Sequence, residues 1–153
     1  MHHFQRQPLT ISDTCDESCG LCATLGCLRP TSIDRETFEA ELEQIQLASP
    51  REIVFAPNAL RHSELSSMVR EIKSRGLDAV VRLRVRHLSE CRELIASLDY
   101  HGAKFELVID RPLATADLDR LNDCAARIDS TVVVMNREID TEAVVESLPE
   151  SFR

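Results

Sequence analysis

Short β-branched runs alternate with amphipathic stretches along most of this chain of 153 residues. The runs at 52–55, 79–85, 105–109 and 131–135 are predicted strands, with centres about 27 residues apart, and a first strand is expected at 9–11. Because a strand, a helix and the next parallel strand are joined by a right-handed crossover, the alternation predicts parallel strands. Two architectures fit: an open doubly wound sheet, or part of a (β/α) barrel.

Helical spacing of apolar residues fills the intervals between these strands, at 34–48, 63–75, 89–102, 115–128 and from 140 onward. Asp34, Ser89 and Asp140 stand at helix starts and are predicted N-caps, because their side chains accept from unpaired backbone N–H groups. Gly76 is predicted to end the second helix. We expect one domain over 1–153, with a flexible N-terminus at 1–8.

Composition narrows the class of protein. Asp and Glu number 26 against 18 Lys and Arg, and the formal net charge is −8. Broad nucleic-acid binding needs a basic face, so nucleic acid is not an expected partner. No apolar run approaches the roughly 20 residues of a membrane helix, and the N-terminus lacks the apolar stretch of a signal peptide. We therefore expect a cytoplasmic protein with no membrane segment.

Three cysteines follow the first predicted strand in a C-x3-C-x2-C array, as Cys15, Cys19 and Cys22. They lie on one loop, 12–33, at the carboxyl end of that strand, where both architectures place their binding loops. Thiolates hold [4Fe–4S] clusters, and three from one loop leave the fourth iron open. Metal binding is favoured over disulfides in a cytosolic chain. Cys27 is either a fourth thiolate of a closed zinc or cluster site, or a packed thiol.

This array, following a strand, resembles the signature of the radical S-adenosylmethionine (radical SAM) enzymes. The resemblance covers about 9–148: the segment 51–76 is similar to the family's second strand, turn and helix, and 131–148 to its fifth strand and helix. It implies an α/β fold, a partial (β/α) barrel of about five βα units with parallel strands, truncated relative to the family's six. We expect Cys15, Cys19 and Cys22 to bind a [4Fe–4S] cluster by this resemblance.

The resemblance also implies an activity. In the family, S-adenosylmethionine binds the fourth iron, and its reductive cleavage gives a 5′-deoxyadenosyl radical that modifies a substrate, here unidentified. An electron donor protein is an implied partner. Catalytic side chains beyond the cluster ligands are not indicated by the sequence.

Four further residues are candidates for binding the cosubstrate or substrate. Asn58 lies in the turn after the second strand, which has neither the glycine nor the glutamate of the family's turn. Alternation on the third strand puts Arg82, Arg84 and Arg86 on one face, and the last two, nearer the ligand-binding end, are candidates for binding a carboxylate. A partly solvated face of ion pairs is the alternative. Asp110 ends the fourth strand, where barrel active sites collect side chains.

A second hypothesis is a non-catalytic iron–sulfur or zinc-binding subunit that keeps the fold and acts through a partner protein. The glycine-free turn and the count of five units favour it. Five units leave a strand edge unpaired, so a partner subunit or a second copy of the chain is expected to cover it. Cys91 and Cys124 are expected to pack as small hydrophobes on inward helix faces. His62 is expected at a helix start on the surface rather than in the pocket.

Overall fold

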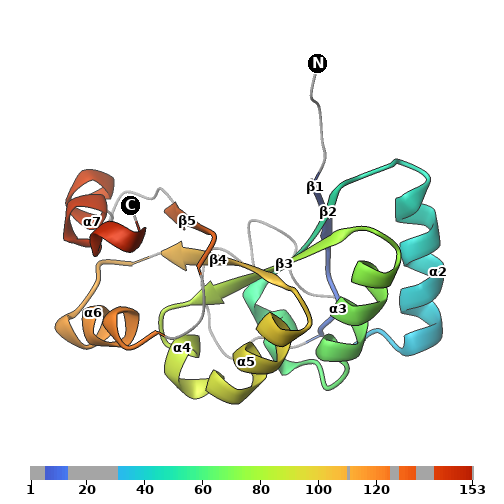
Figure 1. Cartoon of the computed structure of the whole chain (residues 1–153), viewed down its shortest axis with the longest axis horizontal. Helices are drawn as coiled ribbons and strands as arrows, with labels where there is room; N and C mark the ends of the chain where they lie inside the picture. The colour runs from blue at the N-terminus through green and yellow to red at the C-terminus, as the bar shows by residue number, and fades with distance from the viewer. Residues whose placement is uncertain (1–5, 14–30, 110, 125–127, 134–139, 153) are drawn as a thin grey trace.

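The computed structural model of this chain describes residues 6–13, 31–109, 111–124, 128–133 and 140–152. Within these residues five parallel strands form one sheet (Figure 1). The strands are β1 (Arg6–Leu9), β2 (Glu52–Phe55), β3 (Asp78–Arg84), β4 (Lys104–Ile109) and β5 (Ser130–Val133). Their order across the sheet, β1-β2-β3-β4-β5, is their order along the chain.

This strand order decides between the two architectures. A doubly wound sheet reverses direction at a switch point, and the five described strands show no reversal. Right-handed crossovers that all step the same way place their helices on one face of the sheet. The helices that cover that face in Figure 1 are α2 (Arg35–Gln46), α3 (Leu65–Ser74), α4 (His87–Glu90), α5 (Arg92–Tyr100) and α6 (Thr115–Asn122). The fold is a partial (β/α) barrel, the architecture that the resemblance implies.

The last described elements lie beside β5. Helix α7 (Thr141–Ser147) is drawn next to β5 in Figure 1, and the short η2 turn (Glu150–Phe152) follows it. Thr131 Oγ1 of β5 donates to the carbonyl oxygen of Phe152 at 3.2 Å. None of the described helices is long and apolar enough to span a membrane.

The two faces of the sheet differ in chemistry. Alternate strand residues such as Phe55, Leu83 and Leu107 are fully buried against the helices and form the core with them. The opposite face, called here the inner face, carries the other alternate residues of β1 to β4. These are Arg6, Pro8, Glu52, Val54, Asp78, Val80, Arg82, Arg84, Lys104, Glu106 and Val108. The inner face is therefore mostly charged, while the helix-covered face is apolar.

Three predicted helix signals are confirmed. Asp34 accepts a hydrogen bond from Thr37 N at 2.7 Å, which lowers the pKa of its carboxyl, and Asp140 accepts from Ala143 N at 3.1 Å. Gly76 has φ +78° and follows α3, and Leu77 N donates to Ile72 O, which closes the helix in the manner of a Schellman motif.

The first strand lies earlier than predicted. It spans Arg6–Leu9 rather than 9–11, so residues 6–8 do not belong to the flexible N-terminus expected at 1–8. Arg6 pairs with Glu52 in the register of β1 and β2 and forms ion pairs with Glu52 and Glu106, at 2.9 and 2.7 Å. Ion pairs with residues of β2 and β4 hold this polar segment in the sheet. The hydropathy of the segment alone therefore does not identify it as a strand.

The prediction of Ser89 as an N-cap is wrong. Ser89 lies inside α4, and its Oγ donates to the carbonyl of Arg86 at 3.1 Å. Cys91, at φ −116°, separates α4 from α5, which begins at Arg92. The apolar spacing from 91 to 98 continues across this break, so the pattern alone reads as one helix.

Two predicted element ends also differ. Helix α6 ends at Asn122, where the sequence predicts a helix to 128, and residues 125–127 lie outside the described residues. Strand β5 begins at Ser130 and its described part ends at Val133, while the predicted end at 134–135 lies outside the described residues.

Candidate functional site

The residues singled out from the sequence follow four neighbouring parallel strands. The cysteine loop follows β1, Asn58 follows β2, Arg84 ends β3 with Arg86 two residues beyond it, and Asp110 follows β4. Because parallel strands end at the same edge of a sheet, these segments leave the sheet at one edge. Cys15, Cys19, Cys22, Cys27 and Asp110 themselves lie outside the described residues.

The two ends of the cysteine loop are held together at the carboxyl end of β1. The backbone N–H of Ile33 donates to the carbonyl of Ile11 at 3.0 Å. Next to this pair, Ser32 Oγ donates to Asp13 Oδ1 at 2.8 Å. Ile11 and Ile33 are buried in the core, and Ser12 beside Ile11 is buried as well. The loop therefore leaves and returns at one anchored point.

His62 ties the returning end of that loop to the segment after β2. Its Nε2 lies 2.7 Å from the carbonyl oxygen of Ile33, and its Nδ1 accepts from the backbone N–H of Glu64 at 3.1 Å. Since Nδ1 is the acceptor, Nε2 carries the hydrogen and donates to Ile33. The ring is half-buried and precedes α3, so His62 lies at a helix start, as expected, but it supports the loop rather than only facing solvent.

Asn58 lies in a compact turn. The turn is a 3-10 helix, η1 (Pro57–Arg61), in which Pro57, Asn58, Ala59 and Leu60 are all buried. Ala59 N donates to Ala56 O at 3.0 Å and His62 N donates to Ala59 O at 2.9 Å. The segment that stands where the family has a glycine-rich turn is thus a packed helical turn with internal hydrogen bonds.

A cavity of about 200 Å³ opens on the inner face beside these segments. Its lining comes from β1, from β2 and from Arg82 of β3. The residues are Arg6, Pro8, Leu9, Thr10, Val54, Ala56 and Arg82. Thr10 and Ala56 directly follow β1 and β2, so the cavity reaches the edge where the cysteine loop begins.

The three arginines predicted on one face of the third strand do not all lie on that face. Arg82 and Arg84 share the inner face, as predicted, but Arg86 lies beyond the strand, in helical conformation at the start of α4. Side chains alternate between the two faces only within a strand, so this rule does not predict the direction of Arg86, which lies after the end of β3. Arg82 donates to Glu106 Oε1 at 2.9 Å, which matches the alternative of an ion-paired face.

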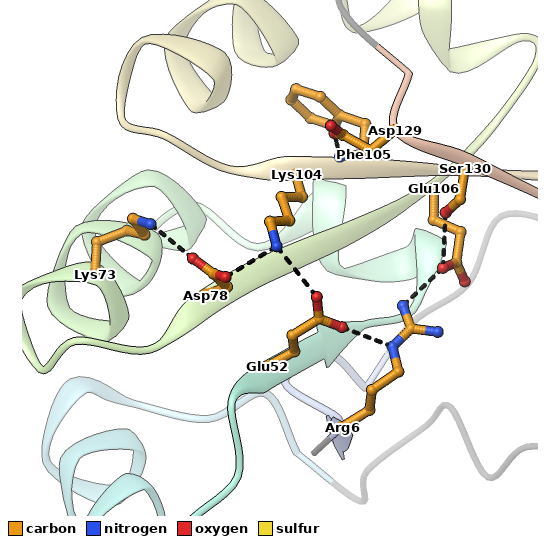
Figure 2. A network of polar contacts seen from close by, with 9 residues as sticks. All are labelled: Arg6, Glu52, Lys73, Asp78, Lys104, Phe105, Glu106, Asp129 and Ser130. Carbon is orange, nitrogen blue, oxygen red and sulfur yellow. Dashed lines mark hydrogen bonds and ion pairs between the residues drawn. The ribbon is translucent and has the colours of Figure 1, made fainter. Parts of the chain in front are cut away.

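Glu106 belongs to a charge network on the inner face, and Figure 2 shows its contacts with Arg6 and Ser130. Its carboxylate accepts from Arg6 at 2.7 Å, from Arg82 at 2.9 Å and from Ser130 Oγ at 3.1 Å. Burial raises the pKa of this carboxyl, but the hydrogen bonds and charges of Arg6 and Arg82 outweigh it, so the pKa is lowered. Glu106 is therefore an ionised structural acid with no proton to supply near neutral pH.

The network continues toward the amino ends of the strands. Lys104 pairs with Glu52 at 3.3 Å and with Asp78 at 2.9 Å, and Lys73 pairs with Asp78 at 2.8 Å. Figure 2 shows these contacts as one chain of charges from Arg6 to Lys73. Bases and acids thus alternate along this chain of contacts, and this end of the inner face is a structural ion network.

Arg84 and Arg86 line a second cavity, of about 260 Å³, at the carboxyl ends of β3 and β4. Arg84 is only 5% exposed, and Arg86 is half-buried and pairs with Glu90 at 3.6 Å. The other described lining residues are Val85, Glu90, Val108, Ile109, Arg111, Leu113, Asp117 and Arg120. The structure thus brings two of the four predicted ligand-binding residues to one cavity, while Asn58 lies at a different part of the edge.

Sequence reasoning missed several residues of this edge. An acid within the buried run 105–109 was a signal for Glu106, because a central parallel strand is usually apolar on both faces. His87 is buried and its Nδ1 accepts from Arg84 N at 3.0 Å, which holds the turn after β3, and no pattern indicated it. Arg111 and Arg120 line the cavity only because the chain after β4 folds back toward β3.

The remaining cysteines of the described chain have a packing role. Cys91 and Cys124 are half-buried and pack against the hydrophobic core, as predicted, but neither lies on a helix face: Cys91 separates α4 from α5, and Cys124 follows the end of α6. Among the described residues, no three His, Cys, Asp or Glu side chains are grouped so that they could hold a metal.

Known proteins resemble this chain in fold rather than in sequence. No protein-family model and no curated protein matches it. A solved structure, that of BtrN in complex with AdoMet and 2-DOIA, is similar to it with a TM-score of 0.55 and 15% sequence identity. The similarity covers 85% of this chain and 56% of the BtrN chain, so this chain spans little more than half of BtrN's length. At this identity the likeness shows the fold alone.

Proposed function

We propose that this chain binds a [4Fe–4S] cluster through Cys15, Cys19 and Cys22 and cleaves S-adenosylmethionine reductively, as the radical SAM enzymes do. The observation that carries the proposal is the position of the cysteine array. The loop that bears it leaves and returns at the carboxyl end of β1, held by Ile11 and Ile33. The fold is similar to that of BtrN, whose structure holds AdoMet, which is S-adenosylmethionine.

The residues present fit such a cluster. Three thiolates from one loop are the donor set of a cluster with an open iron. Ile11 and Ile33 are buried where the loop starts and ends, and a shell of apolar side chains limits solvent access to a metal site. When bound, the cluster supplies the electron that cleaves S-adenosylmethionine to a 5′-deoxyadenosyl radical.

The chain's own residues would position the reactants. His62 and the Ser32–Asp13 contact hold the two ends of the loop at the edge of the sheet. We propose that Asn58, which follows β2, contacts the cosubstrate. Arg84, Arg86 and Asp110, at the ends of β3 and β4, are proposed to contact the cosubstrate or the substrate. An electron donor protein is a necessary partner for this chemistry. The described sheet has edges at β1 and β5, and a partner subunit or second copy is proposed to cover one of them.

Anaerobic reconstitution tests this function. Wild-type protein is loaded with iron and sulfide, its metal content and absorption spectrum are measured, and 5′-deoxyadenosine is assayed after reduction. We expect a cluster and 5′-deoxyadenosine from the wild type and from Cys91→Ser, a control in the helical layer. Cys19→Ser is expected to lose the cluster. A Cys19→Ser protein that keeps the full cluster would contradict the assignment, as would a loaded, reduced wild type that makes no 5′-deoxyadenosine.

One observation favours a second candidate function. The η1 turn is packed and internally hydrogen-bonded, whereas a glycine-rich turn leaves its backbone free to approach a ligand. A chain with such a turn could keep the metal site and act as a non-catalytic iron–sulfur or zinc-binding subunit. Zinc in the isolated protein, lost in Cys27→Ala, would support a four-thiolate site. Iron that Cys27→Ala retains would support the three-thiolate cluster.

A further inference from the structure

The cavity at the carboxyl ends of β3 and β4 gathers positive charge. Four arginines line it: Arg84 at the end of β3, Arg86 before α4, Arg111 after β4, and Arg120 on α6. They come from two segments of the chain, 84–86 and 111–120, which are separated by α4, α5 and β4. Only the fold brings them to one place.

The charge of the lining is opposite to that of the chain. The described lining residues include two acids, and each pairs with an arginine: Glu90 with Arg86 at 3.6 Å, and Asp117 with Arg120 at 3.1 Å. Four arginines and two acids give the described lining a formal charge of +2, in a chain whose net charge is −8. A cleft of one sign with low-dielectric walls concentrates ions of the opposite sign.

The walls of the cavity supply the low-dielectric surface. Val85, Val108 and Ile109 are buried and line it together with Leu113, while Arg84 lies almost completely within the protein. Its volume of about 260 Å³ is close to the small end of the ~300–1,000 Å³ range of ligand pockets. A small molecule fits this space, and guanidinium groups bind carboxylate and phosphate in a bidentate manner.

We propose that this cavity binds the substrate of the protein, and that the substrate is a small molecule with a carboxylate or phosphate group. The part of the inference that concerns a substrate rests on the proposed function, since it deepens that function by naming a substrate class. The anion site itself rests on the arginines, on their place at the carboxyl edge and on the apolar walls.

Binding of two simple anions tests the inference on the full-length, anaerobically reconstituted chain. Succinate and inorganic phosphate are titrated separately by calorimetry into the wild type, Arg84→Gln, Arg111→Gln and the control Arg70→Gln, an exposed residue of α3. We expect saturable binding of at least one anion, weakened about tenfold or more in Arg84→Gln and Arg111→Gln and unchanged in the control. The tighter-binding probe identifies the acidic group. Arg111 is exposed, so its variant reports on binding even if Arg84→Gln unfolds.

Three outcomes would overturn the proposal: no saturable binding to the wild type, unchanged affinity in Arg111→Gln, or displacement of the bound probe by S-adenosylmethionine. The last would assign the cavity to the cosubstrate. Assaying 5′-deoxyadenosine on the same preparations separates the two proposals. Anion binding lost in Arg111→Gln, without cleavage by the wild type, supports the anion site and contradicts the radical chemistry. Cleavage without anion binding contradicts the substrate assignment alone.

Discussion

Glu106 shows what one buried charge does in this protein. It is 2% exposed, lies in the middle of β4, and accepts hydrogen bonds from Arg6 of β1, Arg82 of β3 and Ser130 of β5. A buried carboxylate is tolerated only when charge partners and hydrogen bonds compensate its lost hydration. Here those partners come from three other strands, so a single side chain ties most of the sheet together.

We expect Glu106→Gln to destabilise the protein. The change removes the charge but keeps the shape, and it leaves Arg6 and Arg82 without their shared acid. Because both arginines keep some contact with solvent, the loss is expected to be about 1–3 kcal/mol rather than the larger cost of a fully buried pair. Urea unfolding measures it, with Glu36→Gln on the exposed face of α2 as the control. Equal stability of Glu106→Gln and the wild type would show that the network contributes nothing net.

His62 and η1 show how secondary elements position the candidate site. The ring is held by the N–H of Glu64, just before α3, and in turn donates to Ile33, just before α2. Two helix starts are thereby linked at the point where the cysteine loop returns. The sequence places His62 at a helix start because apolar spacing begins at Leu65, but it contains no sign of a contact with a residue 29 positions away.

We expect His62→Ala to weaken retention of the cluster without unfolding the chain. The variant loses one anchor of the loop, while the Ile33–Ile11 and Ser32–Asp13 contacts remain. Iron content after reconstitution and the rate of cluster loss in the presence of a chelator are the measurements. His101→Ala is the control, because His101 follows α5 and precedes β4, at the amino ends of the strands. If both variants hold their iron like the wild type, His62 has no part in supporting the site.

Helices and strands were predictable here where a periodic pattern is long. The 3.6-residue period places α2 and α3 because their apolar faces meet the sheet, and side-chain caps at Asp34 and Asp140 mark two starts. The break between α4 and α5 at Cys91 was not predictable, since the apolar pattern of the predicted helix at 89–102 gives no sign of it. The position of β1 was also mispredicted, at 9–11, because the strand forms from the more polar segment Arg6–Leu9 that pairs with β2.

The molecule as a whole is a sheet with two distinct ends. At the amino ends of the strands, the ammonium group of Lys104 pairs with both Glu52 and Asp78. At the carboxyl ends lie the anchored cysteine loop, the η1 turn and the arginine-lined cavity. This division matches that of (β/α) barrels in general, in which one end serves stability and the other chemistry.

The ion network predicts loss of stability in acid. Hydrogen bonds from Lys73 and Lys104 lower the pKa of Asp78, and the pKa of Glu106 is lowered as described above. A carboxyl with a folded-state pKa below its unfolded value stabilises the fold above the unfolded pKa, and this contribution is lost as the pH falls through the folded pKa. Urea midpoints should therefore decrease below about pH 4.5, the ordinary value for Glu. The decrease in the urea midpoint should be smaller in Glu106→Gln, because that variant lacks one of the carboxyls with a lowered pKa. An identical pH profile in the variant and the wild type would contradict this role of Glu106.

By itself the sequence determined the alternation of strands and helices, the three-cysteine array after the first strand, and several helix ends. These are local properties, because periodicity and capping depend on residues within a few positions of one another. The alternation fitted an open doubly wound sheet as well as a partial barrel, and the resemblance to a family favoured the barrel. The strand order of the tertiary structure decided between them.

The tertiary structure alone also decided which charges meet. Arg6 and Glu106 are 100 residues apart in the chain and 2.7 Å apart in the fold, and the four arginines of the cavity come from two segments, 84–86 and 111–120. Such pairs cannot be predicted from the sequence alone, since they depend on the register between neighbouring strands and on the direction of each crossover. The cysteine array could be recognised from residue spacing, whereas the cavity at the ends of β3 and β4 exists only because parallel strands bring their carboxyl ends to one edge.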